Sequence, residues 1–308
     1  MLGTPAEFQA PIPEEARIDR RDLEVFDDRE VPEGFWHTDR LRYSTLLQDH
    51  EAPLVFVVAG TGADDQSRHM LMIGRMLHAA GMHVVLLPSP SHANFIINAS
   101  ASRLPGYPAS DAADLHNLMR LIDGRLRRSV AISRYYLTGY SLGGWHVAHV
   151  AKLDDELAGS GGRSGFGFDR VLLINPPLSV YRSVKEIDAM LVRGLPDGIY
   201  GLDAFLNRAL ARLAAYPGAD ALDFQDPDLK IEAYRRLRPS DDQLATAIGL
   251  AFRLSAANLV FTSDVMTGAG YIFPRDRPFR STTPLSEYLA VALRTSLLDY
   301  FDDMLAGS

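Results

Sequence analysis

Residues 134–150, which read RYYLTGYSLGGWHVAHV, decide the fold of this chain. A short β-rich run at 135–138 is followed by the pattern Gly-x-Ser-x-Gly and then by a segment compatible with a helix. In this context the pattern predicts a sharp turn between a strand and a helix, which lifts the Ser141 hydroxyl clear of the sheet. Gly139 and Gly143 leave the room that so tight a turn needs. Ser141 is therefore predicted to be a nucleophile; the alternative is a glycine-rich connection that serves packing alone.

Outward from this turn, apolar runs alternate with helical patterns. Residues 54–58, 83–87 and 171–174 are typical of strands that are buried on both faces. Residues 66–80 and 110–126 carry apolar side chains at helical spacing. This alternation predicts a doubly wound, mostly parallel α/β sheet with helices on both faces.

Three regions are expected along the chain. Residues 1–52 would form an N-terminal arm with opening strands at 23–26 and 41–47, and residues 53–178 would form the α/β core. Residues 180–215 and 240–262 are rich in Leu and Ala at helical spacing, and residues 179–308 are predicted to be a helical cap region.

Within the predicted cap, two segments need separate comment. Residues 258–262, NLVFT, are the one candidate strand there, although they fit a helix equally well. The last helix is expected to be capped by Thr283, with Pro284 at its first helical position.

Composition restricts the function classes. The 308-residue chain has a formal net charge of −8 and no cysteine. The acidic balance and the lack of a basic run predict no nucleic-acid partner, and disulfides and thiolate metal sites are excluded. The first 22 residues have no apolar segment typical of a signal peptide, and we expect no membrane-spanning run. A cytoplasmic location is the default expectation, and no pattern indicates the oligomeric state.

The turn after residues 54–58 reads Ala59-Gly60-Thr61-Gly62. A dinucleotide fingerprint would need a further glycine where Asp65 stands, and the Gly-Lys-Ser/Thr of a phosphate loop is absent. We therefore expect no nucleotide, metal or redox cofactor. A plain tight turn is the alternative to a functional loop here.

Four segments together resemble the α/β-hydrolase family, in particular a little-characterised bacterial group with a GYSLGG turn. They are the turn at 60–62, the Ser-Pro-Ser-His loop at 89–92, the turn around Ser141 and the Ile-Asn-Pro-Pro segment at 174–177. The resemblance implies an α/β-hydrolase-like sheet with a helical cap, and hydrolysis of a small-molecule acyl substrate through an acyl-serine intermediate.

The resemblance also implies roles for individual residues. The N–H groups of Leu142 and Thr61 would stabilise the oxyanion, because this family uses the residue after the nucleophile and a loop after a neighbouring strand. Four further residues are expected to line the pocket: Gly60, Gly62, Tyr140 and Asn175.

The expected histidine is missing from its usual place. In this fold the acid and the histidine follow the serine, but all nine histidines lie at or before residue 149. We therefore expect a truncated hydrolase whose sheet is incomplete at the C-terminal end. Two alternatives are a base from an unusual place and a scaffold that has lost catalysis.

If the base comes from an unusual place, His92 is the best candidate, because it follows a strand that should flank the oxyanion turn. Asp264 would be the acid if residues 258–262 formed a strand. His146 and His149 are spaced for one helix face, but without a third ligand we expect packing or exposure rather than a metal site.

The sequence thus predicts a serine hydrolase that acts on an ester or related acyl bond. An acyltransferase would use the same groups. The alternative from another class is a non-catalytic α/β-hydrolase scaffold that binds a small molecule or a protein.

Overall fold

The computed structural model describes residues 16–159, 165–195, 197–205, 207–208 and 240–306. The chain divides into two compact units. One unit comprises Arg182–Leu254, and the other combines Ile12–Tyr181 with Ser255–Ser308, within the described residues. The predicted 179–308 cap region is therefore divided, because its last part clusters with the sheet.

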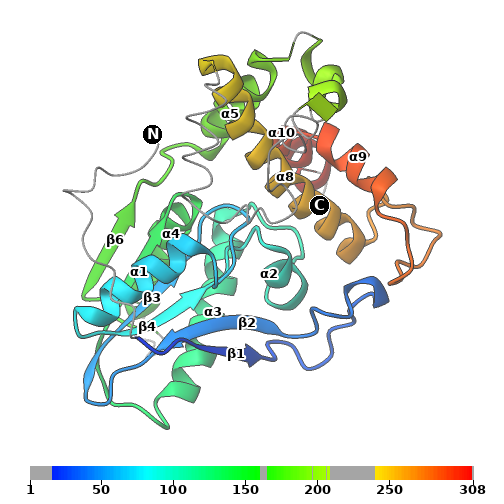
Figure 1. Ribbon diagram of the computed structural model, residues 1–308. Coiled ribbons are helices and arrows are strands. Elements are labelled where there is room, and N and C mark those ends of the chain that lie inside the picture. Colours follow the sequence, from blue (N-terminus) through cyan, green and yellow to red (C-terminus); the bar gives the residue numbers. More distant parts are fainter. Residues whose placement is uncertain (1–15, 160–164, 196, 206, 209–239, 307–308) are drawn as a thin grey trace. The chain divides into compact units, whose positions relative to one another are not determined.

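A six-stranded sheet organises the second unit, in the order β1-β2-β4-β3-β5-β6 (Figure 1). Strand β2 is antiparallel to β1 and β4, whereas β3 is parallel to β4 and β5, and β5 is parallel to β6. The mostly parallel sheet that the sequence predicts is thereby confirmed. The strands are β1 (Asp19–Leu23), β2 (Leu41–Leu46), β3 (Ala52–Val58), β4 (His83–Leu87), β5 (Ile132–Tyr140) and β6 (Arg170–Ile174).

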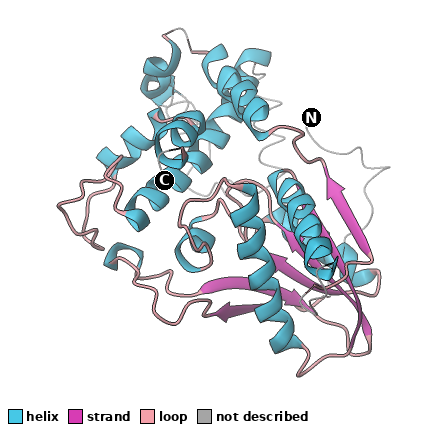
Figure 2. Cartoon of the chain, turned by 180° about the vertical axis from the view of Figure 1, so that it is seen from behind, coloured by secondary structure: helices cyan, strands magenta, loops and turns pink. Residues whose placement is uncertain are grey.

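Helices cover both faces of this sheet. Alternate side chains of the buried β3 point to opposite faces, so that each face packs against different helices. Val55 and Val57 pack in a cluster with Met70 of α1. Leu54 and Phe56 pack in another cluster, with side chains of α2, α3 and α4. Helix α1 lies in front of the sheet in Figure 1, and α3 and α4 lie in front in the opposite view of Figure 2. The helices are α1 (Arg68–Ala79), α2 (Ala93–Asn98), α3 (Pro108–Leu126) and α4 (Leu142–Gly159).

Strand β6 differs from the prediction of a buried strand. Among the described residues it pairs with β5 alone, so that it is an outer strand of the sheet. Its side chains are largely uncovered: Val171, Leu172 and Leu173 are 40%, 57% and 40% exposed. An apolar run indicates a strand, but it does not show whether anything covers that strand.

The opening antiparallel pair is present, although its first strand lies earlier than predicted. Strand β1 ends at Leu23, where the sequence predicted residues 23–26 to begin a strand. The first four side chains of β1 are charged and only Leu23 is buried, which fits an edge strand that is partly exposed. A further helix, α2, which is not predicted from the sequence, begins directly after His92 and lies between β4 and α3.

The unit formed by Arg182–Leu254 contains most of helix α5 (Val180–Arg193), the short helix η3 (Gly198–Gly201) and the first part of α8 (Asp241–Thr267). Here α5 and α8 touch backbone to backbone at Gly249, where a Cβ atom would lie 2.5 Å from the Leu191 nitrogen. The part of the predicted helical pattern at residues 209–215 lies outside the described residues.

The candidate strand at 258–262 is helical, since it lies in the 27-residue helix α8. The last predicted helix is divided and begins later. Helix α9 (Ser286–Arg294) has Leu285 at its N-cap, and Thr283 instead accepts a hydrogen bond from the Arg280 N–H at 3.0 Å. Two short segments follow: α10 (Leu297–Tyr300), which opens on a capping box, and the π-helical turn η5 (Phe301–Leu305).

By length and composition, α8 is long and apolar enough to cross a membrane, which the sequence reading did not expect. Of the most apolar 18-residue stretch of this helix, 44% is buried within the protein. A core helix of a soluble protein passes the same test, so the finding is weak evidence for a membrane span.

Candidate active site

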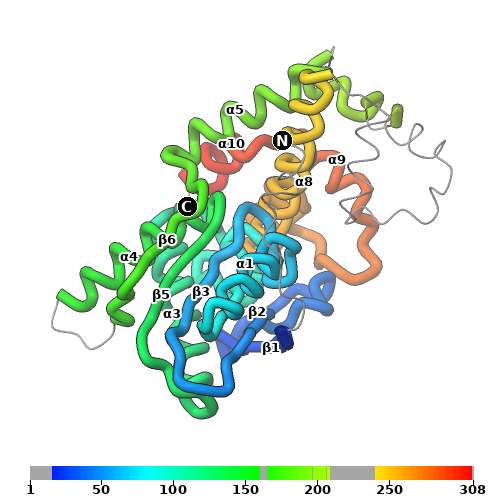
Figure 3. The backbone as a smooth tube through the Cα atoms, turned by 60° about the vertical axis from the view of Figure 1, so that its left-hand side comes forward, coloured from blue at the N-terminus to red at the C-terminus, as the bar shows by residue number. Residues whose placement is uncertain are grey.

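The turn at Ser141 has the strained geometry that its sequence predicts. Ser141 has a φ of 53°, in the left-handed region that non-glycine residues rarely occupy, and its side chain is exposed. A Cβ atom at Gly143 would lie 2.2 Å from the Val58 carbonyl oxygen, and one at Gly139 would lie 2.5 Å from the Gly143 oxygen. Glycine is therefore required at both positions. Figure 3 traces the chain from β5 through this turn into α4 and on to β6.

The backbone around Ser141 directs one N–H group inward and leaves others available. The N–H of Ser141 donates to the Ile174 carbonyl at 2.8 Å, which ties the turn to the end of β6. Leu142 is the first residue of α4, and its N–H has no acceptor among the described residues. A helix N-terminus favours negative charge, so this N–H suits an oxyanion.

The predicted oxyanion turn lies directly beside the serine. A Cβ atom at Gly60 would lie 3.2 Å from the Ser141 Cβ. The N–H of Gly62 donates to the Ser91 Oγ at 2.8 Å. The Thr61 N–H between them has no acceptor in the described part of the chain. Both predicted oxyanion donors are thus unoccupied next to an exposed hydroxyl.

Ser91 is a positioning residue that the sequence reading did not single out. Its hydroxyl contacts Ser89 Oγ at 2.9 Å as well as the Gly62 N–H, and the Ser89 N–H donates to the Ala63 carbonyl at 3.0 Å. The loop after β4 therefore holds the turn after β3 in place. The Ser-Pro-Ser-His motif at 89–92 was the available signal, because short hydroxyl side chains favour such local bonds.

His92 does not have the contacts of a general base for Ser141. Its Nδ1 accepts a hydrogen bond from the Asn94 N–H at 3.2 Å and caps α2. The proton of the neutral ring is therefore on Nε2, whereas a base needs a free lone pair there. Burial lowers the pKa of His92, which keeps the ring neutral. The ring lines a cavity whose walls do not include Ser141.

Asp264 is not placed as a catalytic acid. The role depended on a strand at 258–262, and this segment is a helix. The Asp264 carboxylate is 1% exposed and accepts the N–H groups of Tyr271, Ile272 and Phe273 at 2.7, 2.8 and 2.6 Å. It anchors the loop that follows α8.

Two other histidines form buried pairs with carboxylates. His146 Nε2 lies 3.3 Å from Asp111 Oδ2, and His116 Nε2 lies 2.8 Å from Asp154 Oδ1. These pairs join α3 to α4. Nothing in the sequence marked them, because each pair is separated by more than 30 residues.

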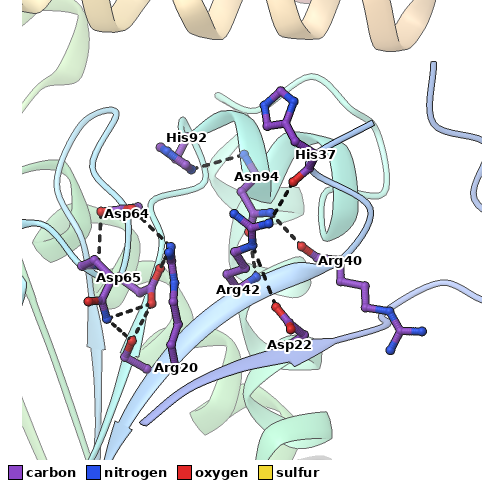
Figure 4. A network of polar contacts seen from close by, with 11 residues as sticks. Arg20, Asp22, His37, Arg40, Arg42, Asp64, Asp65, His92 and Asn94 are labelled. Carbon is purple, nitrogen blue, oxygen red and sulfur yellow. Dashed lines mark hydrogen bonds and ion pairs between the residues drawn. The ribbon is translucent and has the colours of Figure 1, made fainter. Parts of the chain in front are cut away.

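No histidine accompanies Ser141 in the described residues, which include all nine histidines. In Figure 4 the His92 ring accepts a hydrogen bond from the Asn94 N–H, and the backbone carbonyl of His37 accepts one from Arg42. The His69 ring lies 5.7 Å from the ring of Tyr140, which precedes Ser141. His146 is buried and the His149 ring lies 4.5 Å from the Trp145 ring, which agrees with the packing expected of these two side chains. Among the described residues, no group of three metal-ligating side chains occurs.

The four residues predicted to line a pocket lie at the carboxyl ends of β3, β5 and β6, and their pocket role stays a prediction. Tyr140 packs in the core cluster on the α1 face, and Gly62 lies against Ser255, where a Cβ atom would be 2.7 Å from the Ser255 Cβ. Asn175 is exposed, with a φ of 49°. None of these residues, nor Gly60, lines either of the two cavities described next.

Two cavities open near the carboxyl edge of the sheet. A small one of about 40 Å³ adjoins the nucleophile turn through Leu142 and is largely apolar. We call it the Leu142 cavity; its walls include Ser91, His146, Leu259 and Phe301. A larger one of about 440 Å³ is lined by Arg42, His92 and Asn258, among others, and we call it the Arg42 cavity.

Comparisons with known proteins give a likeness in fold alone. No family model matches the chain, and no curated protein matches it. Among solved structures it is similar to Est1E from Butyrivibrio proteoclasticus, with 12% identity over 48% of this chain and 51% of that one (TM-score 0.34). For an inhibited esterase B from Lactobacillus rhamnosis the identity is 15%, over 82% of this chain and 65% of that one (TM-score 0.35).

A third similar structure is a hyperthermophilic esterase from the archaeon Pyrobaculum calidifontis, with 16% identity over 56% of this chain and 49% of that one (TM-score 0.35). The chain therefore spans about half of the first and third of these proteins and less than two thirds of the second.

The fold assignment follows from the geometry of the chain itself. Strand β5 leads through a strained serine turn into α4, and the turn stands at the carboxyl edge of a mostly parallel sheet that helices cover on both faces. This is the structural context that gives the Gly-x-Ser-x-Gly pattern its meaning. The chain has the α/β-hydrolase fold.

Proposed function

We propose that the chain carries the nucleophile and the oxyanion donors of an esterase, with Ser141 forming the acyl intermediate. The observation that carries this proposal is the exposed Ser141 at a φ of 53°. Such strain costs roughly 1–3 kcal/mol, and it persists where the surroundings enforce it, often at functional sites. Packing alone does not need a serine in this conformation.

In the proposed reaction, Ser141 Oγ attacks the ester carbonyl carbon, and the N–H groups of Leu142 and Thr61 stabilise the resulting oxyanion. The alcohol then leaves with a proton, and water releases the acid from the acyl-serine. Transfer of the acyl group to another acceptor would use the same residues.

The proton from Ser141 needs a base, and no histidine of the chain is bonded to the Ser141 hydroxyl, although all nine histidines are described. Without a triad base, an oxyanion site still gives roughly 10³–10⁴-fold catalysis over water. We therefore expect slow but measurable acylation of Ser141 in this chain by itself.

The Leu142 cavity supports a small acyl group. Its volume of about 40 Å³ holds only a few atoms, and it adjoins the predicted oxyanion donor. Leu142, Trp145 and Phe301 give it an apolar lining. An acetyl-sized acyl group fits this volume better than a long chain does.

Reaction with a fluorophosphonate probe and turnover of p-nitrophenyl acetate test the proposal. We expect folded wild-type protein to be labelled, and Ser141→Ala and urea-unfolded protein to be unlabelled. Leu142→Pro removes the oxyanion N–H at a first helical position, where proline is tolerated, and should slow acylation by about 10²–10³-fold. Leu142→Ala keeps the N–H and should react at the wild-type rate, with circular dichroism to verify that each variant is folded.

Two results would overturn the proposal. One is folded wild-type protein that reacts no faster than Ser141→Ala with both reagents. The other is equal acylation of folded Leu142→Pro and Leu142→Ala. The first result would instead favour a scaffold that binds ligands without catalysis.

A further inference from the structure

The Arg42 cavity has the dimensions of a small-molecule site. Its volume is about 440 Å³, within the roughly 300–1,000 Å³ that is usual for ligand pockets. All of its walls come from the unit that contains the sheet. They are provided by the opening strands, the loops after β3 and β4, and the C-terminal part of α8.

One part of the wall is apolar and aromatic. The Phe279 ring lies 4.9 Å from the Phe35 ring and 5.5 Å from the Phe261 ring, measured between centroids. Ile97 and Leu285 extend this surface. An aryl or alkyl body would bury its apolar area here, because aromatic rings pack favourably at such separations.

The two acidic side chains at the cavity, Asp64 and Asp65, share one cationic partner, Arg20. Arg20 donates to Asp65 at 2.9 Å and to Asp64 at 3.4 Å (Figure 4). Asp65, which is 1% exposed, also accepts the Ser44 hydroxyl at 2.5 Å. The Asp64 carboxylate further accepts the Gln66 N–H at 3.1 Å. These contacts leave the two carboxylates with little capacity to bind a cationic ligand.

The cavity wall also carries donors. The Arg42 guanidinium donates through one terminal nitrogen to the His37 carbonyl at 2.9 Å, and its Nε forms a long ion pair of 3.9 Å with Asp22; its side chain is 40% exposed. Because Asn94 bonds to the His92 Nδ1, the free N–H of His92 is at Nε2. The exposed Asn258 accepts from Thr262 through its oxygen, and its amide N–H₂ group has no acceptor among the described residues. A cation and two N–H donors therefore line one cavity.

We propose that the Arg42 cavity binds an organic monocarboxylate with an aromatic or alkyl body. The carboxylate accepts hydrogen bonds from Arg42, and from the His92 and Asn258 N–H groups, while the body packs against the phenylalanines. Arginine suits this task because its planar N–H groups match the two oxygens of a carboxylate.

This site is distinct from the nucleophile turn. His92 and Asn258 face the Arg42 cavity, whereas their chain neighbours Ser91 and Leu259 face the Leu142 cavity. Ser141 lines neither cavity, and Leu142 lines the smaller one. The inference therefore does not rest on the proposed esterase function.

Calorimetric titration with 3-phenylpropionate tests the proposal, with 3-phenylpropionamide and 3-phenylpropylamine as the neutral and cationic comparators. We expect saturable binding of the carboxylate and at least about tenfold weaker binding of the amide, which loses the charge-assisted hydrogen bond. The amine should not bind, because its charge has the opposite sign. Ser141→Ala should bind the carboxylate as the wild type does.

Variants assign the binding to this cavity. Arg42→Gln should weaken carboxylate binding about tenfold or more and change amide binding little. Arg134→Gln removes the same charge from an exposed position paired with Asp169 and should have no effect. If Arg42→Gln does not fold, Asn258→Leu on the exposed surface of α8 serves as a second variant, with weaker binding expected.

Three outcomes would overturn the proposal. They are no saturable binding of 3-phenylpropionate by the wild type, equal affinity for the amine, and unchanged carboxylate affinity in both folded Arg42→Gln and Asn258→Leu. Loss of binding in Ser141→Ala would place the ligand at the nucleophile turn and would overturn it as well.

Discussion

At the scale of single residues, the nucleophile turn depends on the absence of two side chains. The clash at Gly143 is with backbone, the Val58 and Ala59 carbonyl oxygens, so that a neighbouring side chain cannot move to relieve it. The helix and the strand approach each other this closely because both glycines lack a Cβ atom. Ser141 occupies a left-handed conformation as a result.

Gly143→Ala should therefore destabilise the protein by about 2–4 kcal/mol, since an overpacked site must shift backbone. The measurement is urea unfolding followed by circular dichroism. Gly124 in α3 gives a matched control, because a Cβ atom there meets nothing within 4 Å. Gly124→Ala should stabilise by about 0.5–1 kcal/mol. Similar effects of the two substitutions would contradict this account of the turn.

Asp114 makes stability depend on pH. Burial raises its pKa to about 6, and Asp111 adds to the increase, while the Ala101 N–H and Arg29 oppose it. Its folded pKa thus exceeds its unfolded value, so the folded state holds the proton more tightly. The contribution to stability is full below about pH 4 and is lost as the pH rises through about 6.

The wild type should lose stability between pH 5 and pH 8. We expect Asp114→Asn to lose about 1–2 kcal/mol less over this range, because its side chain stays neutral and still accepts the Ala101 N–H. Thermal unfolding of both proteins at the two pH values measures the difference. Asp155→Asn, an exposed acid on α4, is the control and should leave the pH dependence unchanged. An Asp114→Asn variant with the wild-type pH profile would argue against the raised pKa.

At the scale of elements, Asp264 shows how a side chain can hold a loop onto a helix. Its carboxylate takes three N–H groups from residues 271–273 and is buried. Removing an acceptor from several buried donors leaves those donors unpaired.

Asp264→Ala should therefore cost about 2–4 kcal/mol of stability. The exposed Asp276 lies in the same loop, and Asp276→Ala should change stability by less than about 0.5 kcal/mol. Denaturant unfolding of the two variants gives the comparison. If Asp264→Ala is as stable as the wild type, the anchoring role is wrong.

The sequence predicts the elements around the nucleophile well. The glycines at 139 and 143 specify the turn, and continuous apolar runs specify β3 and β4 as strands buried on both faces. The oxyanion turn follows from its position after β3. Each of these features depends on residues close together in the chain, and local patterns report such features reliably.

Other features depend on contacts between distant segments. NLVFT has β-branched and aromatic residues typical of a strand, but it continues the helical spacing of α8, and the helix prevails. The His116–Asp154 pair and the ion pair of Asp65 with Arg20 join residues far apart in sequence. No periodicity records such pairs, so neither the structural role of these residues nor the Arg42 cavity could be predicted.

At the scale of the whole molecule, the chain combines a sheet unit with the separate unit Arg182–Leu254. The esterase activity proposed for this chain depends on the turn at Ser141, which lies in the sheet unit.

The open side of β6 has a consequence for behaviour in solution. Its backbone N–H and C=O groups on the side away from β5 have no strand partner in the described part of the chain, and its leucines face solvent. Such a strand is a template for pairing with a strand of another molecule. We expect reversible self-association that grows with protein concentration and is measurable by sedimentation velocity.

Leu172→Lys should suppress this self-association, because a charged side chain on an edge strand disfavours pairing. Leu178 is 101% exposed and lies beyond the strand, so Leu178→Lys adds the same charge without blocking the edge. Equal suppression of self-association by both variants would indicate an effect of net charge. A wild-type chain that stays monomeric at high concentration would contradict pairing through the edge of β6.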